Sequence, residues 1–495
     1  MKKNFLAYGI VFLSLCCIID LNLRWSALVF TAIAILLFWQ QRDEKTPLPP
    51  VSLLLLANVL GYPIVAVVPD MYDELRQGLN PYMIEFALLW AVRGFAAFAC
   101  AYVAADAFAR RFHQQRHLGW KDAEKLAYAR YICHAMGIFS ITAWVAKEHF
   151  FGFGLTFITG RATFDITSAE SSFAQVLELL INLRNPFFFM LGVMHLRRLD
   201  DRFMRLLAVG IGGGILFEIV TIGSKGAIIF WLVLAALVIA CTVQRLSLKQ
   251  LFIGGFMLLT VYMSFLTITE YRDIMHDRNR RGEDVFDISV QAESFSEAFL
   301  ASLPFSEKRA QRRTTVSEQD ILSRISSGLF SFGHILYFTG GHPPYEHAWE
   351  AFLIPLYSIA PRALLDKPVF FNAGRFGLEY FHTSTAISVS TLGAFYHAWG
   401  YIGIVTGMAL IGGMTAFLIR RVLSRTTALN SAVFMVTTIM SLVNVGSSFW
   451  GVVVELCRLA VILSGLYMLY PVVKRIRHGH QAETMLVVYR AEDGL

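Results

Sequence analysis

Long apolar runs recur along this chain of 495 residues, and they limit its fold more than any other feature. A helix needs about 20 predominantly apolar residues to cross the hydrocarbon core of a bilayer. Twelve runs approach this length. They lie near residues 5–20, 25–40, 51–68, 82–105, 128–147, 173–195, 203–221, 226–242, 251–268, 397–419, 430–447 and 452–471. The pattern predicts an all-α polytopic membrane protein with about twelve transmembrane helices.

The composition indicates that part of the surface of this protein contacts lipid. Hydrophobic residues make up 56% of it and charged residues only 16%, and the mean hydropathy is +0.54. An average soluble chain is about 25% charged, so this chain cannot cover its apolar residues with a polar shell. The six cysteines lie in or beside apolar runs and form no Cys-x-x-Cys pair. That favours small core residues over disulfides or metal ligands.

Positive charge is distributed unevenly between the two sets of loops. With the N-terminus placed in the cytoplasm because of Lys2 and Lys3, the cytoplasmic segments carry 22 Lys and Arg residues, against four in the short outer loops. Cytoplasmic loops of membrane proteins accumulate these residues. The net charge of +7 therefore reflects topology and not a nucleic-acid partner, and both termini are predicted to be cytoplasmic.

One outer segment, residues 269–396, is far longer than the other loops and divides the chain. Nine predicted transmembrane helices precede it in residues 1–268, and three follow in residues 397–471. Residues 472–495 form a cytoplasmic tail. The long segment holds 12 Lys/Arg and 15 Asp/Glu residues, so its charge is nearly balanced. Long loops translocate regardless of their charge, and the segment is predicted to be a periplasmic loop.

Within the long segment, residues 272–320 are polar and are predicted to be partly helical. Four apolar residues further on share one helical face, at spacings of three, four and seven. They are Trp349, Phe352, Leu353 and Leu356. We expect an amphipathic helix on the membrane surface there. An alternative makes residues 321–338 and 349–365 two further spans. Two more crossings preserve the orientation, so charge leaves twelve and fourteen spans both open.

Signatures of soluble enzymes are missing from the sequence. There is no GxxxxGK[ST], HExxH or GxSxG motif, which argues against ATP-driven transport and zinc proteolysis by this chain. Two GxxxG pairs, Gly210/Gly214 and Gly403/Gly407, favour close helix packing. The predicted outer surface instead offers cations close to the bilayer.

Guanidinium groups bind phosphate oxygens through paired hydrogen bonds, so outer cations beside helix ends suit a lipid-linked diphosphate. Six residues are candidates for this contact. They are Arg161, Lys225, Arg272, Arg362, Lys367 and Arg375. Other arginines of the long loop, Arg278, Arg280 and Arg281, are better interpreted as solvated charges.

Three segments resemble those of bacterial polysaccharide repeat-unit polymerases, the O-antigen and exopolysaccharide polymerases of the Wzy class. Residues 360–368, Ala-Pro-Arg-Ala-Leu-Leu-Asp-Lys-Pro, resemble their Pro-Arg…Asp-Lys-Pro segment. Residues 393–403, from Gly393 to Gly403, resemble the aromatic-Gly-x-x-Gly pattern where the chain re-enters the membrane. Residues 222–226, Ile-Gly-Ser-Lys-Gly, resemble a Gly-Ser-Arg-Gly span opening. The resemblance covers roughly residues 155–415.

The resemblance implies a membrane glycosyltransferase of the bacterial inner membrane, with a GT-C-like architecture and its site on the outer face. A glycan on undecaprenyl diphosphate would move en bloc to a hydroxyl of a single lipid-linked repeat unit. Arginines can stand in for a metal, so we expect neither a metal nor a cofactor. The implied partners are the lipid-linked oligosaccharide, the bilayer, a chain-length regulator and a flippase.

The general base is expected among His397, His382 and Glu379. The histidines have suitable unperturbed pKa values, and each could equally be a hydrogen-bonded structural residue. The sequence departs from the family pattern at Ala394, where a Glu is common, and at Lys225, where an Arg is usual.

Two rival functions remain open from the sequence. An O-antigen ligase would move the glycan to a lipid core and would also have a long outer loop, although the Pro-Arg…Asp-Lys-Pro segment favours the polymerase. A flippase for lipid-linked oligosaccharides would favour inverted repeats and charges lining a central cavity. The long outer loop counts against the flippase.

The uneven charge predicts that residue 300 faces outward and residue 480 faces the cytoplasm. Topology reporters fused after these two positions should therefore give opposite signals. The same signal from both fusions would overturn the topology.

Overall fold

The computed structural model describes most of the chain. The residues outside the description are 1, 17–21, 43–48, 65–78, 113–122, 152–167, 197, 223–224, 243–259, 261–262, 265, 269, 272, 276, 285–286, 303–316, 346–388, 425–428, 444–448 and 493–495. The described residues are almost all helical, and no strand occurs among them. The prediction of an all-α chain is confirmed for this part of the protein.

The helices follow the apolar runs of the sequence closely. Their bounds are α1 (Lys2–Cys16), α2 (Leu23–Gln41), α3 (Ser52–Val59), the π-helix η1 (Leu60–Ile64), α6 (Pro81–Phe112), α7 (Ala123–Phe151), α9 (Ser168–Ile181), α10 (Arg184–Leu196), α11 (Arg202–Ile222), α12 (Lys225–Thr242), α14 (Ile288–Ser302), α16 (Ser317–Phe338), α19 (Thr391–Ser424), α20 (Leu429–Val443) and α21 (Phe449–Glu492). Every predicted run overlaps described helical residues, although most of the run 251–268 lies outside the description.

Five helical stretches of the described residues are long and apolar enough to cross a membrane. They are Leu23–Gln41, Pro81–Arg110, Val176–Leu196, Thr391–Val422 and Val452–Arg475. Shorter apolar helices are Ser52–Ile64, Val233–Thr242, Gly328–Phe338 and Ala432–Leu442. These helices are compatible with a membrane protein. The number of spans, twelve or fourteen, stays a prediction.

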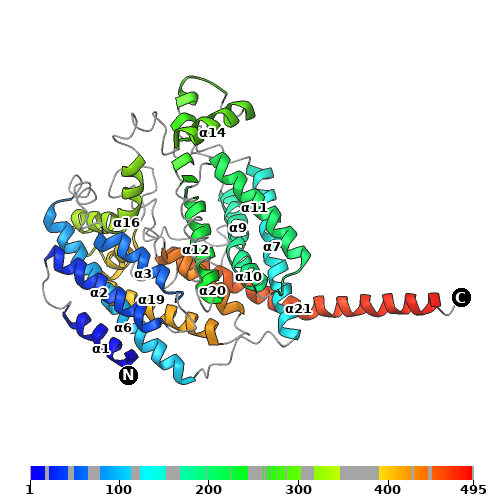
Figure 1. The fold of residues 1–495 in the computed structure, drawn as a ribbon, viewed down its shortest axis with the longest axis horizontal. Helices are drawn as coiled ribbons and strands as arrows, with labels where there is room; N and C mark the ends of the chain where they lie inside the picture. The colour runs from blue at the N-terminus through cyan, green and yellow to red at the C-terminus, as the bar shows by residue number, and fades with distance from the viewer. Residues whose placement is uncertain are drawn as a thin grey trace.

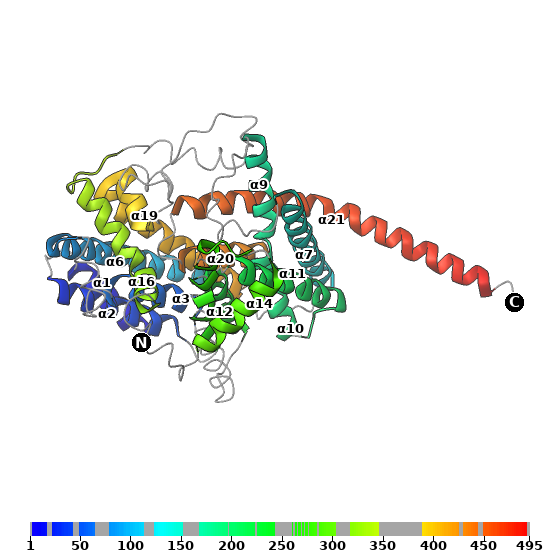
Figure 2. The ribbon, with the colours of Figure 1, turned by 90° about the horizontal axis from the view of Figure 1, so that it is seen from above.

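The parallel pair of α6 and α19 is the most extensive helix contact in the described structure (Figures 1 and 2). At one end Trp90 stacks on Tyr401, with ring centroids 4.3 Å apart. At the other end the Arg420 Nε lies 3.0 Å from a carboxylate oxygen of Asp106. Residue numbers rise together along α6 and the part of α19 that follows Gly400, so these two segments run in the same direction. Between these ends a Cβ added to Gly412 would lie only 2.2 Å from the Phe98 carbonyl oxygen, so the two backbones touch.

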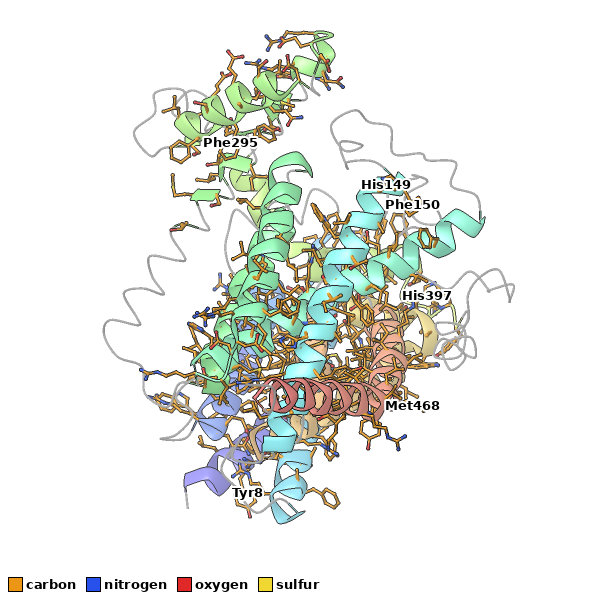
Figure 3. All side chains as sticks on the ribbon, turned by 90° about the vertical axis from the view of Figure 1, so that its right-hand side faces the viewer. Tyr8, His149, Phe150, Phe295, His397 and Met468 are labelled. Atoms are coloured by element: carbon orange, nitrogen blue, oxygen red, sulfur yellow. The ribbon has the colours of Figure 1, made fainter. Side chains whose placement is uncertain are left out.

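The helices α7, α9 and α11 form a second group (Figure 1). Ser140 of α7 donates to the Ile181 carbonyl at 3.0 Å, and Gly210 and Gly214 of α11 lie against Ile141 and Trp144 of α7. The first GxxxG pair therefore packs helices, as predicted. Figure 3 shows the end of α7, marked by His149 and Phe150, on the side of the molecule that carries Phe295 of α14.

A small helical hairpin that contains α14 stands at the top of the molecule in Figure 1, and Phe295 marks it in Figure 3. Helix α14 pairs with the described residues between 260 and 280, and Tyr271, Met275 and Ala298 are buried between them. The hydroxyls of Thr267 and Ser302 lie 2.8 Å apart. The prediction that residues 272–320 are partly helical is confirmed.

Helix α16 belongs to the main core and does not lie on its surface. Leu329, Phe332 and Leu336 are completely buried, and the helix contacts α6, η1 and α19. The whole of α16 has 22 residues, which gives about 33 Å of helix. Its buried apolar part, Gly328–Phe338, packs into the helical core.

Two adjacent glycines of α19 allow a matched test of the α6–α19 contact. Gly412→Ala should lower the free energy of unfolding by about 1–3 kcal/mol, because its Cβ would collide with the Phe98 backbone. Gly413→Ala meets only Ala105 at 4.0 Å and should be neutral or gain up to about 1 kcal/mol from helix propensity. Thermal unfolding in detergent measures both, and equal midpoints would contradict the close backbone contact.

Candidate functional site

Several polar side chains converge where α19 begins. The Ser390 side chain accepts from the Gly393 backbone N–H at 3.1 Å and so caps α19. The Ser390 N–H donates to the Ser331 hydroxyl of α16 at 3.2 Å. The phenol of Tyr62, in η1, also forms a hydrogen bond with Ser390. Three elements far apart in sequence are therefore held together at one buried serine.

The element that carries Tyr62 is a short π-helix, η1, with Pro63 inside it. Single π-turns are rare and are frequent at functional sites. Between η1, α6, α19 and α20 lies a cavity of about 30 Å³, large enough for a water molecule. Tyr62 and Asn58 supply its polar side chains, and Thr391 lines it as well. The start of α19 is thus accompanied by irregular backbone and a small internal space.

Helix α19 is sharply kinked ten residues after it begins. Gly400 has φ 66° and ψ −154°, a conformation that is essentially restricted to glycine. The kink turns the first part of α19 back on the second, so that the Phe395 ring lies within 2.5 Å of where a Gly407 Cβ would be. The second GxxxG pair, Gly403 and Gly407, therefore packs against Phe395, which precedes the kink in the same helix.

Aromatic residues surround the kink. Tyr401 stacks on Trp90 and donates to the Gly341 carbonyl at 2.7 Å. Tyr396 and Tyr401 have ring centroids 5.1 Å apart. Tyr82 and Tyr345 are 65% and 62% exposed, so the cluster offers ring faces and hydroxyls at the surface. Tyr345 also has a left-handed backbone, with φ 53°.

Of the residues predicted to act in catalysis or diphosphate binding, only His397 has a described side chain. It lies on α19 just before the kink and is 1% exposed. In Figure 3 it marks the part of the molecule where α19 begins. Lys225 is the first residue of α12, and its side chain lies outside the description. The remaining predicted site residues lie outside the described residues. They are Arg161, Arg272, Arg362, Lys367, Arg375, Glu379 and His382.

Five of those residues belong to residues 346–388, whose two flanks contact opposite ends of the α19 segment that precedes the kink. On one flank, Gly341 accepts the hydrogen bond of Tyr401, and Tyr345 contacts the kink at Gly400. On the other flank, Ser390 is bonded to Ser331. The expected surface helix from Trp349 onward is part of this segment and is also outside the description.

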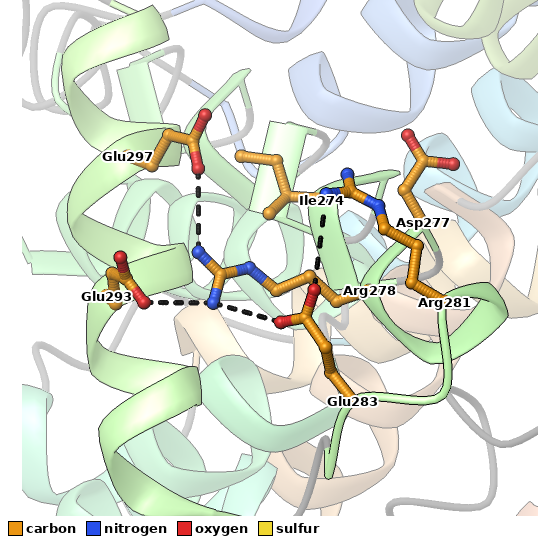
Figure 4. A pocket seen from close by; sticks show the side chains of 7 residues that line it. All are labelled: Ile274, Asp277, Arg278, Arg281, Glu283, Glu293 and Glu297. Atoms are coloured by element: carbon orange, nitrogen blue, oxygen red, sulfur yellow. Dashed lines mark hydrogen bonds and ion pairs between the residues drawn. The ribbon is translucent and has the colours of Figure 1, made fainter.

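Arg278, in the α14 hairpin, is surrounded by carboxylates and not by groups that would leave it to bind a phosphate (Figure 4). Arg278 is only 14% exposed and lies 2.9 Å from Glu293, 3.5 Å from Glu283 and 3.8 Å from Glu297. The hydrogen bond from Arg278 to Glu293 and the neighbouring carboxylates raise the pKa of its guanidinium. Arg278 is therefore held by carboxylates and is neither solvated, as its sequence suggested, nor open to an anion.

Sequence reasoning missed Tyr62, Ser331, Ser390 and Tyr401, although each one orients the start of α19. Their hydrogen bonds join residues 59 or more positions apart, and isolated polar residues in apolar runs carry no periodic signal. The one usable sign was Pro63, which interrupts a predicted span. Among the described residues, no group of three His, Cys, Asp or Glu side chains is placed to hold a metal.

Comparisons with known proteins leave the family open. No family model, no curated protein and no solved structure matches the chain.

The kink at Gly400 can be tested with a second glycine as control. Gly400→Ala should cost about 1–3 kcal/mol of stability for its backbone conformation. Its Cβ would also lie 2.9 Å from Pro343 and 3.0 Å from the Tyr345 hydroxyl, so the flank of residues 346–388 must shift. Gly282→Ala, at φ 80° with no neighbour within 4 Å, should carry only a backbone cost. Thermal unfolding and limited proteolysis of 346–388 measure the two effects, and equal proteolysis rates would remove the predicted shift.

Proposed function

We propose that this protein is a membrane glycosyltransferase that polymerises undecaprenyl-diphosphate-linked oligosaccharide repeat units. One observation carries the proposal. The segment that holds Arg362, Lys367, Arg375, Glu379 and His382 has flanks that contact the two ends of residues 391–400, the helix start that holds His397. This supports grouping the candidate residues of both segments in one site.

The glycine pattern that resembles the Wzy-class polymerases also has a physical reason in this fold. Gly400 adopts a backbone that other residues avoid. A Cβ added to Gly393 would lie 2.5 Å from the Ile335 side chain of α16. A Cβ added to Gly403 would lie equally close to the Phe395 carbonyl oxygen. The three glycines together permit a compact, back-folded helix start. This supports an interpretation of residues 393–403 as a functional re-entry into the membrane.

The proposed reaction transfers a glycan between two lipid carriers. The acceptor hydroxyl oxygen bonds to the anomeric carbon of the donor glycan, and the bond from that carbon to the diphosphate oxygen breaks. The hydroxyl proton passes to a base, and undecaprenyl diphosphate leaves with the bonding electrons. The protein must align two lipid-held substrates and neutralise the charge that develops on the diphosphate.

The proposed roles follow from this chemistry. Arg362 and Lys367, with Arg161, Lys225, Arg272 and Arg375, would contact the diphosphate. His397, His382 and Glu379 are the candidates for the base. Because His397 is buried in this conformation, its service as a base requires the kinked segment to open. The exposed faces of Tyr82 and Tyr345 and the nearby hydroxyls suit the mixed apolar and polar surface of a sugar.

Loss of the protein should leave surface glycans that carry a single repeat unit. Gel separation of these glycans after gene deletion distinguishes the proposal from its rivals. A missing ligase would leave no glycan on the lipid core, and a missing flippase would block export of the repeat unit. Either of those two patterns would contradict the polymerase.

Arg362→Lys tests the contact with the leaving group. The change keeps the charge but removes the two-pronged guanidinium, and it should cost about 2–4 kcal/mol of transition-state stabilisation. The corresponding rate loss is roughly 30-fold to 1000-fold. Lys367→Arg should be milder, since one cation replaces another. The assay is polymerisation of a lipid-linked repeat unit by purified variants, with folding checked by thermal unfolding.

A purely structural role for Arg362 gives a different pattern. If Arg362 only pairs with Asp366, four residues away, Asp366→Ala should match Arg362→Ala, and Arg362→Lys should be nearly silent. Full polymerisation by well-folded Arg362→Ala would exclude the leaving-group role.

A further inference from the structure

The C-terminal ends of α2, α6 and α19 meet at one charged cluster, which we name the basic rim. It consists of Arg110 and Arg420, which pair with the carboxylate of Asp106, and of Arg42 and Arg421, which directly follow Gln41 and Arg420 in the chain. The three helices end close to these residues, at Gln41, Phe112 and Ser424. Figure 1 shows this end of α6 far from the α14 hairpin. The basic rim therefore lies where three neighbouring helices stop.

Asp106 holds two of the arginines in a fixed geometry. It is 4% exposed. The Arg110 Nε and Nη2 lie 2.9 and 2.5 Å from its Oδ2, and the Arg420 Nε lies 3.0 Å from its Oδ1. The Gln41 side-chain amide donates to the same carboxylate at 3.2 Å. One buried carboxylate thus ties the ends of three helices together.

The basic rim keeps a net positive charge after this pairing, because two guanidinium groups share one carboxylate. Arg110 is 36% exposed at its side chain, so it reaches the surface. A guanidinium has more N–H donors than these contacts use. Arginines whose planes are held in place are suited to bidentate binding of phosphate oxygens.

Two further arginines stand on aromatic rings at the same helix ends. The Arg42 guanidinium carbon lies 4.9 Å from the centroid of the Trp39 ring, and that of Arg421 lies 5.8 Å from the centroid of the Phe417 ring. Trp39 and Phe417 are 50% and 41% exposed. Exposed aromatic rings just inside a row of cations are the arrangement expected at a membrane–water interface.

We propose that the basic rim binds the headgroup phosphate of an anionic phospholipid. The arginines would contact the phosphate oxygens, and the lipid's acyl chains would lie along the exposed faces of Trp39 and Phe417. Basic pockets between transmembrane helices bind anionic headgroups in this way. The proposal depends neither on the glycosyltransferase function nor on which side of the membrane the basic rim faces.

The test uses the full-length protein in neutral detergent, titrated with phosphatidylglycerol or phosphatidylcholine and followed by native mass spectrometry. Phosphatidylglycerol should bind more tightly. Arg42→Gln and Arg421→Gln should each weaken its binding about fivefold. Arg24→Gln is the matched control, because Arg24 is exposed at the other end of α2, and it should leave binding unchanged. Equal binding of the two lipids, or an equal loss in the control, would overturn the proposal.

Two further experiments are needed. The first distinguishes binding of a lipid phosphate from binding of free phosphate, and the second distinguishes a site of fixed geometry from attraction by net charge. Soluble glycerol 3-phosphate shares the headgroup chemistry and should not displace phosphatidylglycerol at equal concentration; displacement would show a site for free phosphate instead. Asp106→Asn removes a negative charge but frees both arginines. Weaker lipid binding by this variant supports the fixed geometry, and tighter binding would show that net charge alone decides.

Discussion

The backbone contact between α6 and α19 is the interaction on which the rest of the structure depends. In lipid, apolar side chains gain little by leaving the solvent, so helices associate through close van der Waals packing at small residues. Gly412 provides such a place against Phe98. One end of this rigid pair carries the aromatic cluster and the Gly400 kink, and the other end carries Asp106 and Arg420. A single helix pair therefore fixes the positions of both proposed sites.

The positions of the helices were predictable from the sequence, and their partners were not. Apolar runs fix where helices form, because their length must match the bilayer. Nothing in a run of apolar residues shows that residue 98 will meet residue 412. The Gly403/Gly407 pair illustrates the limit, since its spacing correctly predicted packing. The partner was Phe395 of the same helix, because the kink at Gly400 brings that ring back onto the pair.

The candidate site was predictable only in part. The resemblance at residues 393–403 pointed to the start of α19, where His397, Tyr396 and the kink lie. Sequence gave no indication of Tyr62 or Ser331, because a single hydroxyl inside an apolar run is as compatible with a satisfied core as with a site. Charge alone also misassigned Arg278, whose sequence suggested a solvated residue. Its carboxylate partners Glu293 and Glu297 lie on another helix and become neighbours only through the α14 hairpin.

The length of α6 connects the two proposed sites physically. The helix, Pro81–Phe112, has 32 residues and is about 48 Å long, which is enough to pass through a bilayer with its headgroup layers, about 40–45 Å thick. If the basic rim is held at one headgroup layer, Tyr82 and the aromatic cluster around Tyr401 reach the other. Under the proposed function, the diphosphate of a carrier lipid would lie at that second layer. An ordinary phospholipid bound at one end would then set the height at which the opposite end meets the proposed lipid-linked substrates.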